Sequence, residues 1–125
     1  MASGARVVVV LVTCPTRRIA QRLAEALVRR RAAACVNLLP GIHSIFWWEG
    51  KIDRAREVLL LVKTTPAHVA RLTRLVRSLH PYKVPEVMAL PVTAGYAPYL
   101  RWVKASVSRP ASTRPHATTA TACVR

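Results

Sequence analysis

Acidic residues are scarce in this sequence. Five Asp and Glu stand against 20 Lys and Arg among 125 residues, which gives a formal net charge of +15. Paired-carboxylate catalysis therefore has few candidates, and the sequence also lacks the motifs of phosphate-binding loops, serine hydrolases and zinc proteases. The chain is predicted not to be an enzyme.

Cysteine is rare too, and apolar runs are short. The three cysteines, Cys14, Cys35 and Cys123, have neither metal-finger spacing nor the even number of a disulfide framework, which fits a reducing compartment. The apolar run at residues 7–12 is too short for a signal-peptide core, and no run reaches the ~20 residues of a membrane span. We expect no transmembrane segment and a cytoplasmic location.

Apolar residues are plentiful, at 52% of the chain, which is enough for one domain to fold around its own core. The predicted domain covers residues 7–107 and follows a short lead at residues 1–6. Residues 108–125 are dominated by Ser, Thr, Ala, Pro and Arg and are predicted to be a disordered tail.

The spacing of apolar residues predicts an alternation of strands and helices, with Thr16 as the N-cap of the first helix. The predicted elements are a strand at 7–12, a helix at 17–31, strands at 33–48 and 51–64, a helix at 66–79, a strand at 86–92 and a helix at 96–107. This order describes two split βαβ units. We predict an α+β, ferredoxin-like βαββαβ sandwich with a short C-terminal helix, in which Tyr99, Leu100 and Val103 point inward.

The second and third predicted strands form one long hairpin. Pro40-Gly41 predicts a kink or bulge in it, and Glu49-Gly50 predicts a tight reversal. Phe46, Trp47 and Trp48 stand near its tip and must point to both faces of the strand. We predict that the hairpin reaches onto another copy of the chain. The alternative is that these rings pack under the chain's own C-terminal segment.

Cys14 and His80 are the candidate metal ligands. Cys14 stands where the first strand turns into a helix beside Arg17 and Arg18, a setting that lowers a thiol pKa. A thiolate and an imidazole suit copper or zinc. His80 ends the second helix and is not obviously beside Cys14 in this fold. The structural alternative makes His80 a capping residue and Cys14 a small core residue, as Cys35 is expected to be. The remaining histidines are expected at the surface: His43, His68 and His116.

Five segments together closely resemble the CutA family of divalent-cation tolerance proteins. They are VTCP (12–15), AACVNLLPGIHSIFWWEGKI (33–52), EVLLLVKT (57–64), HPYKVPEVMALPV (80–92) and YLRWV (99–103). The resemblance implies a ferredoxin-like fold in a tight homotrimer, with hairpin strands exchanged around a threefold axis. It also implies a link to copper and other divalent metals. For animal members it implies a role in localising or maturing acetylcholinesterase, and so a membrane-associated protein partner.

The chain departs from this pattern at the metal ligands. Copper-linked bacterial members have a cysteine at the position of Val12 and a second histidine at that of Leu79, so only His80 remains of that set. Cys14 fits the VTCP form of animal members. The resemblance implies clefts between subunits, lined by some of Cys14, Trp48, Lys63, His80, Tyr82 and Glu86.

Two other classes of protein have the same order of strands and helices. The first is a nucleic-acid-binding module, but residues 57–63 offer no aromatic ring on a central strand, so any binding should be electrostatic and not sequence-specific. The second is a sensor of small anions, for which Lys63 and Lys83 would suit a phosphate or carboxylate. No glycine-rich cradle supports it.

Overall fold

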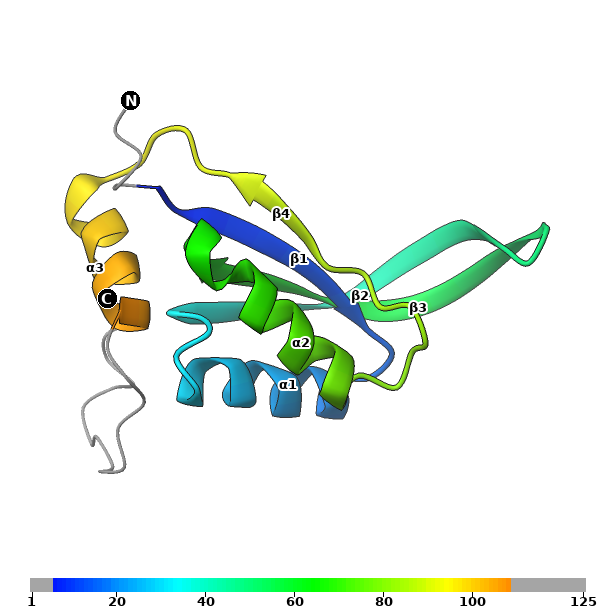
Figure 1. Cartoon of the computed structure of the whole chain (residues 1–125). Coiled ribbons are helices and arrows are strands. Elements are labelled where there is room, and N and C mark those ends of the chain that lie inside the picture. The colour runs from blue at the N-terminus through cyan, green and yellow to red at the C-terminus, as the bar shows by residue number, and fades with distance from the viewer. Residues whose placement is uncertain (1–5, 109–125) are drawn as a thin grey trace.

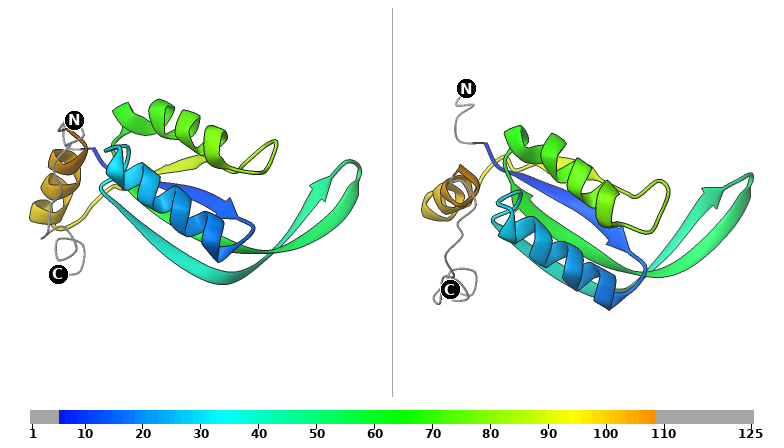
Figure 2. Two further views of the ribbon diagram at one scale, coloured as in Figure 1. Left: turned by 90° about the horizontal axis from the view of Figure 1, so that it is seen from below. Right: turned by 60° about the horizontal axis from the view of Figure 1, so that its bottom comes forward.

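A computed structural model describes residues 6–108 (Figure 1). Four strands form one antiparallel sheet in the order β2-β3-β1-β4, and helices α1 and α2 lie on the same face of it (Figures 1 and 2). The elements are β1 (Val8–Cys14), α1 (Arg17–Arg29), β2 (Cys35–Trp48), β3 (Lys51–Thr64), a 3-10 turn (Pro66–His68), α2 (Val69–Leu79), β4 (Met88–Pro91) and α3 (Ala97–Ser108). This confirms the predicted α+β class. Most of the predicted lead and tail lies outside the described residues.

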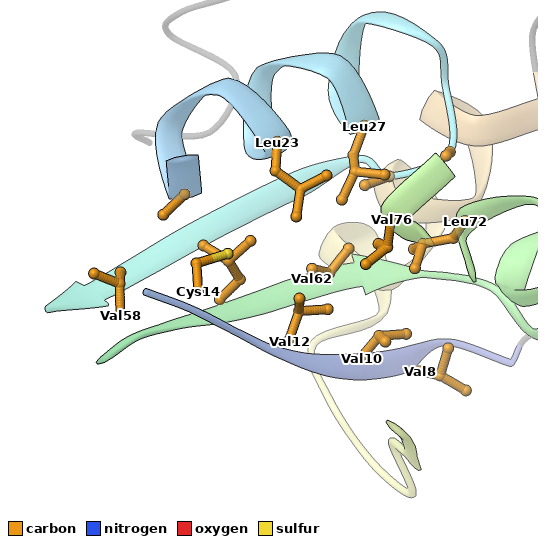
Figure 3. Packing of buried hydrophobic residues seen from close by; sticks show 14 residues of the cluster. Val8, Val10, Val12, Cys14, Leu23, Leu27, Val58, Val62, Leu72 and Val76 are labelled. Atoms are coloured by element: carbon orange, nitrogen blue, oxygen red, sulfur yellow. The ribbon is translucent and has the colours of Figure 1, made fainter. Parts of the chain in front are cut away.

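The main core lies between the sheet and the two helices. Alternate residues of β1 point toward the helices and are buried, and β3 supplies the matching row. Figure 3 shows these side chains meeting Leu23 and Leu27 of α1 and Leu72 and Val76 of α2. The strand β1 runs two residues past its predicted end at Val12, because pairing with β3 continues as far as Cys14 opposite Val58.

Helix α1 begins at its predicted residue and ends early. The backbone N–H of Ile19 donates to the Thr16 hydroxyl at 3.2 Å, which confirms the predicted N-cap. The helix ends at Arg29 rather than at residue 31, because Arg31 adopts a left-handed φ of 61°. The N–H groups of Ala32 and Ala33 then both donate to the Leu27 carbonyl, which satisfies the helix end.

The hairpin of β2 and β3 has arms of 14 residues each, and its tip projects well beyond the sheet (Figure 1). The strand register shifts between Leu39 and Ile42, where Gly41 has a φ of 80°, so the predicted bulge is confirmed. The predicted reversal is also confirmed, since Glu49 and Gly50 both have positive φ, 50° and 80°. Two such residues make the tight turn that matches the twist of paired strands.

The later elements differ in detail from the prediction. The backbone turns once as a 3-10 helix at Pro66–His68 before α2 begins at Val69. Strand β4 is only Met88–Pro91, because its pairing with β1 stops where Met88 meets Leu11.

Helix α3 packs into a separate small cluster, formed by Val7, Ala34, Val103 and Val107, with Leu100 partly buried against it. Val103 is therefore inward, as predicted. The prediction for Tyr99 was wrong, since its side chain remains 36% exposed.

The N-cap of α1 gives a direct test of this description. Replacing Thr16 by Ala leaves the Ile19 N–H without its acceptor and should lower the free energy of unfolding by about 1 kcal/mol. Thr16→Ser keeps a hydroxyl acceptor and should remain close to wild type. Chemical denaturation of the three proteins measures both values, and equal losses for Ala and Ser would contradict the capping role.

Candidate functional site

His80 lies at the end of α2 and points back to the end of β1. Its side chain is 8% exposed, and Nε2 donates to the carbonyl oxygen of Thr13 at 2.7 Å. Its Nδ1 accepts the backbone N–H of Tyr82 at 3.1 Å. A carbonyl can only accept and a backbone N–H can only donate, so these bonds assign a proton to Nε2, and both ring nitrogens have backbone partners. The sequence did not obviously place His80 beside Cys14, and the structure shows it hydrogen-bonded to the carbonyl of Thr13, the residue before Cys14.

Cys14 is fully buried among the core residues between β3 and α1 (Figure 3). Desolvation raises the pKa of its thiol to about 11, and the nearby charge of Glu57 adds to the rise. The predicted thiolate was therefore wrong. Arg17 and Arg18 are exposed, where solvent screens their charges, whereas the sulfur faces apolar neighbours.

Glu57 is the central residue of the site, and sequence reasoning missed it. Its side chain is 7% exposed, and one oxygen accepts the hydroxyl of Tyr82 at 2.8 Å. Burial, the bond to Glu57 and its charge raise the pKa of Tyr82 to about 12. Partial burial and then Glu57 also raise the pKa of Glu86. We call Cys14, Glu57, Tyr82 and Glu86 the Glu57 cluster.

An open pocket of about 430 Å³ adjoins this cluster, between the turn before α1 and the bulge of the hairpin. Glu57 lies on its wall together with the two exposed arginines Arg17 and Arg56. The remaining lining residues are Pro15, Thr16, Pro40, Gly41 and Val58. The pocket therefore has a positive rim around one buried carboxylate.

Lys63 and Trp48 do not join the Glu57 cluster within one chain. Lys63 is half-buried, its ammonium donates to the side-chain oxygen of Asn37, and burial lowers its pKa. Trp48 is at the far tip, paired with Lys51. The twelve residue steps along β3 from Lys51 to Lys63 span about 40 Å. Trp48 and Lys63 thus lie near opposite ends of the hairpin, apart from the Glu57 cluster.

The described residues do not offer a ready metal site. Among residues 6–108, no group of three His, Cys, Asp or Glu side chains is placed to hold a metal ion. Both nitrogens of His80 have backbone partners, and the thiol of Cys14 keeps its proton. As they stand, these two residues do not fit a resident metal. Their role as ligands remains a prediction.

The hairpin tip is an exposed aromatic surface. Phe46, Trp47 and Trp48 have 38%, 72% and 46% of their side chains exposed, and Ile45 and Ile52 beside them have 66% and 54%. No helix of the described chain lies over the hairpin tip (Figure 1). The alternative in which they lie under the chain's own C-terminal segment therefore finds no support there.

Within residues 6–108, the sheet face opposite the helices is mostly apolar and has no helical layer over it (Figure 2). Its members follow from the register, since paired residues share a face and α1 and α2 cover the other one. We call this the uncovered sheet face; its apolar residues are Val9, Leu11, Leu39, Leu59, Leu61, Met88 and Leu90. Leu39, Met88 and Leu90 are 51%, 50% and 44% exposed.

No helix among residues 6–108 combines the length and the apolar character that crossing a membrane requires.

Comparison with known proteins finds relatives that carry one family name. Residues 8–106 match the model of the family described as CutA1 divalent ion tolerance protein. "Protein CutA" of Mus musculus is 54% identical over 92 residues, which are 74% of this chain and 52% of that protein. The "Divalent-cation tolerance protein CutA" of Thermus thermophilus is 48% identical over 96 residues, 77% of this chain and 93% of that protein. The chain thus spans about half the length of its first-matched animal relatives.

A solved structure supports the same relationship. The structure of a divalent cation tolerance protein (Cut A1) from Thermus thermophilus superposes with a TM-score of 0.79 at 46% identity. The match covers 80% of this chain and 97% of that one.

The bond between Tyr82 and Glu57 should stabilise the fold. Tyr82→Phe removes the donor to a buried carboxylate and should lower the free energy of unfolding by about 1–3 kcal/mol. Tyr96→Phe is the matched control, since Tyr96 is 76% exposed, and should change it by less than about 0.5 kcal/mol. Denaturant titration at neutral pH measures both. Similar effects of the two variants would show that the bond contributes nothing.

Proposed function

The chain belongs to the CutA1 divalent ion tolerance protein family, and we propose that it acts in divalent-cation tolerance as a non-enzymatic homotrimer. The strand order and the two helices on one face support the ferredoxin-like arrangement of each subunit. The observation that carries the proposal is the pair of exposed apolar surfaces, the uncovered sheet face and the aromatic hairpin tip.

These two surfaces need a partner. Exposed apolar patches of this extent are uncommon on monomers and mark interfaces. Burial of a large apolar side chain contributes about 1.5–3 kcal/mol. The hairpin projects beyond its own domain, so it can contact the uncovered sheet face only of another molecule (Figure 1). A second and third copy of the same chain supply that surface.

Assembly also explains the scattered cleft residues. Within one chain Trp48 is about 40 Å along the hairpin from Lys63. The hairpin tip of a neighbouring copy would bring its own Trp48 beside this chain's Tyr82 and Glu86. The predicted clefts between subunits are then composite, with the Glu57 cluster from one copy and aromatic rings from the next. Further roles, as a scaffold for protein localisation, in acetylcholinesterase maturation and in the cytoplasm, remain predictions.

The Glu57 cluster suits a structural role better than catalysis. Its thiol and phenol both have raised pKa values, so neither is activated as a nucleophile or base at neutral pH. Tyr82 and His80 instead tie the loop after α2 to β3 and β1 through hydrogen bonds. We infer that this loop forms a fixed wall of the cleft.

Light scattering tests the assembly. The wild-type protein should have three times the chain mass of 13.8 kDa. Replacing the paired hairpin residues Trp47 and Ile52 by Ser should shift the mass toward one chain. The control, Val28→Ser with Leu79→Ser, removes two exposed apolar side chains from the helical layer and should remain trimeric. A monomeric wild type would refute the proposed assembly.

Copper titration tests the predicted ligands. Binding to His80 requires displacement of a backbone partner, and binding to Cys14 requires loss of a proton at neutral pH. We therefore expect wild type and His80→Ala to have equal affinity for Cu(I), measured by chelator competition. A tenfold or larger loss in His80→Ala would instead support the metal role of His80 and show that the loop rearranges. Light scattering of both proteins controls for assembly.

A further inference from the structure

The outer surface of the helical layer is almost purely basic. Helices α1 and α2 lie side by side over the sheet (Figure 2), and their apolar residues point into the core except Val28 and Leu79, which are exposed. Rows of arginine occupy the opposite side of each helix. We call this the basic helical face; its residues are Arg18, Arg22, Arg29, Arg30, Arg71, Arg74 and Arg77. All are exposed except Arg71, which is half-buried.

Helical spacing places these arginines together. Arg18, Arg22 and Arg29 are four and seven residues apart, so they follow one side of α1 over about 16 Å. On α2, Arg74 stands opposite the buried residues Leu72 and Val76, with the other two arginines on either side of it.

A hydrogen bond joins the two rows. The guanidinium of Arg71 donates to the carbonyl of Arg30 at 2.8 Å, which ties the end of α1 to the start of α2. The rows therefore form one continuous surface rather than two separate stripes.

Acidic residues are nearly absent from this surface. Glu25 is the only acid in α1, and α2 has none. The other four acids of the chain lie on the hairpin or in the Glu57 cluster. Seven of the 20 Lys and Arg residues of the chain therefore lie on a surface that carries a single acid. Glu25 is the one acid within the α1 row, three residues after Arg22 and four before Arg29.

We propose that the basic helical face binds the phosphate backbone of nucleic acid without sequence preference. Guanidinium groups match phosphate oxygens with paired hydrogen bonds, and clustered arginines give an electrostatic footprint for a polyanion. Binding of this kind releases counterions and weakens steeply with salt.

Two features favour nucleic acid over an anionic membrane and predict indifference to base sequence. A helix that lies on a membrane buries an apolar side in lipid, whereas the apolar sides of α1 and α2 are already buried in the core. The two helices contain no aromatic residue, so no ring is available for base stacking. The aromatic surface is on the hairpin instead.

The experiment measures fluorescence anisotropy of a labelled oligouridylate of about 20 nucleotides, with salt varied from about 50 to 200 mM. The face variant replaces Arg18, Arg22, Arg74 and Arg77 by Gln. The control replaces Arg6, Lys51, Lys83 and Arg101 by Gln, which removes the same four charges from exposed positions elsewhere. Circular dichroism and light scattering verify that both variants keep the fold and assembly.

We expect the face variant to bind at least about tenfold more weakly, because it loses four phosphate contacts. Each lost contact also lowers the slope of log affinity against log salt concentration by about 0.7. Four lost contacts should reduce that slope by about 3. The control should retain affinity within about threefold, and oligocytidylate should bind as tightly as oligouridylate.

Three results would overturn the proposal. The first is no binding at the lowest salt. The second is an equal loss in the two variants, which would assign the affinity to net charge alone. The third is tighter binding to phosphatidylserine vesicles than to the oligonucleotide at equal phosphate concentration, which would identify a membrane as the partner. None of these results depends on the proposed role in cation tolerance.

Discussion

The sheet of this protein has two largely apolar faces, and residues 6–108 place a helical layer on one of them. Val10, Val12 and their neighbours are fully buried under α1 and α2, whereas the residues between them on β1 and β3 stay partly exposed on the other face. A β-strand alternates its side chains, so the same short stretch of chain must supply both faces. The described chain provides α3 only at the edge of the sheet, and Leu39, Met88 and Leu90 of the uncovered sheet face remain exposed in it.

In the proposed assembly, the hairpin of a neighbouring copy covers the uncovered sheet face. Its arms extend beyond the sheet: Gly41 lies at the bulge and Gly50 closes the tip, both at a φ of 80°. Side chains at left-handed φ are strained, so these positions favour glycine. The bulge bends the pair just where the sheet ends. The aromatic residues therefore project beyond their own domain. They are exposed because the backbone of the hairpin carries them away from the core.

Local signals predicted most of the fold, and contacts between distant segments explain what they missed. The side chain of Thr16 predicts a helix start. The backbone preferences of Glu49-Gly50 predict a tight turn. Glu57 carries no such signal. It is buried because the loop after α2 returns to β3 and brings the Tyr82 hydroxyl to it. The Cys14 thiol was misjudged for the same reason, since its neighbours in sequence are arginines while its neighbours in space are apolar.

The charge distribution fits this division between inner and outer surfaces. Copies that associate through the uncovered sheet face and the hairpin leave their basic helical faces outward, so like charges repel while apolar surfaces attract. Exposed charges farther apart than about 10 Å are largely screened at 0.1 M salt. Each large apolar side chain buried contributes about 1.5–3 kcal/mol regardless of that screening. Apolar burial therefore dominates the association, and the arginines stay free to face solvent or a polyanion without opposing assembly.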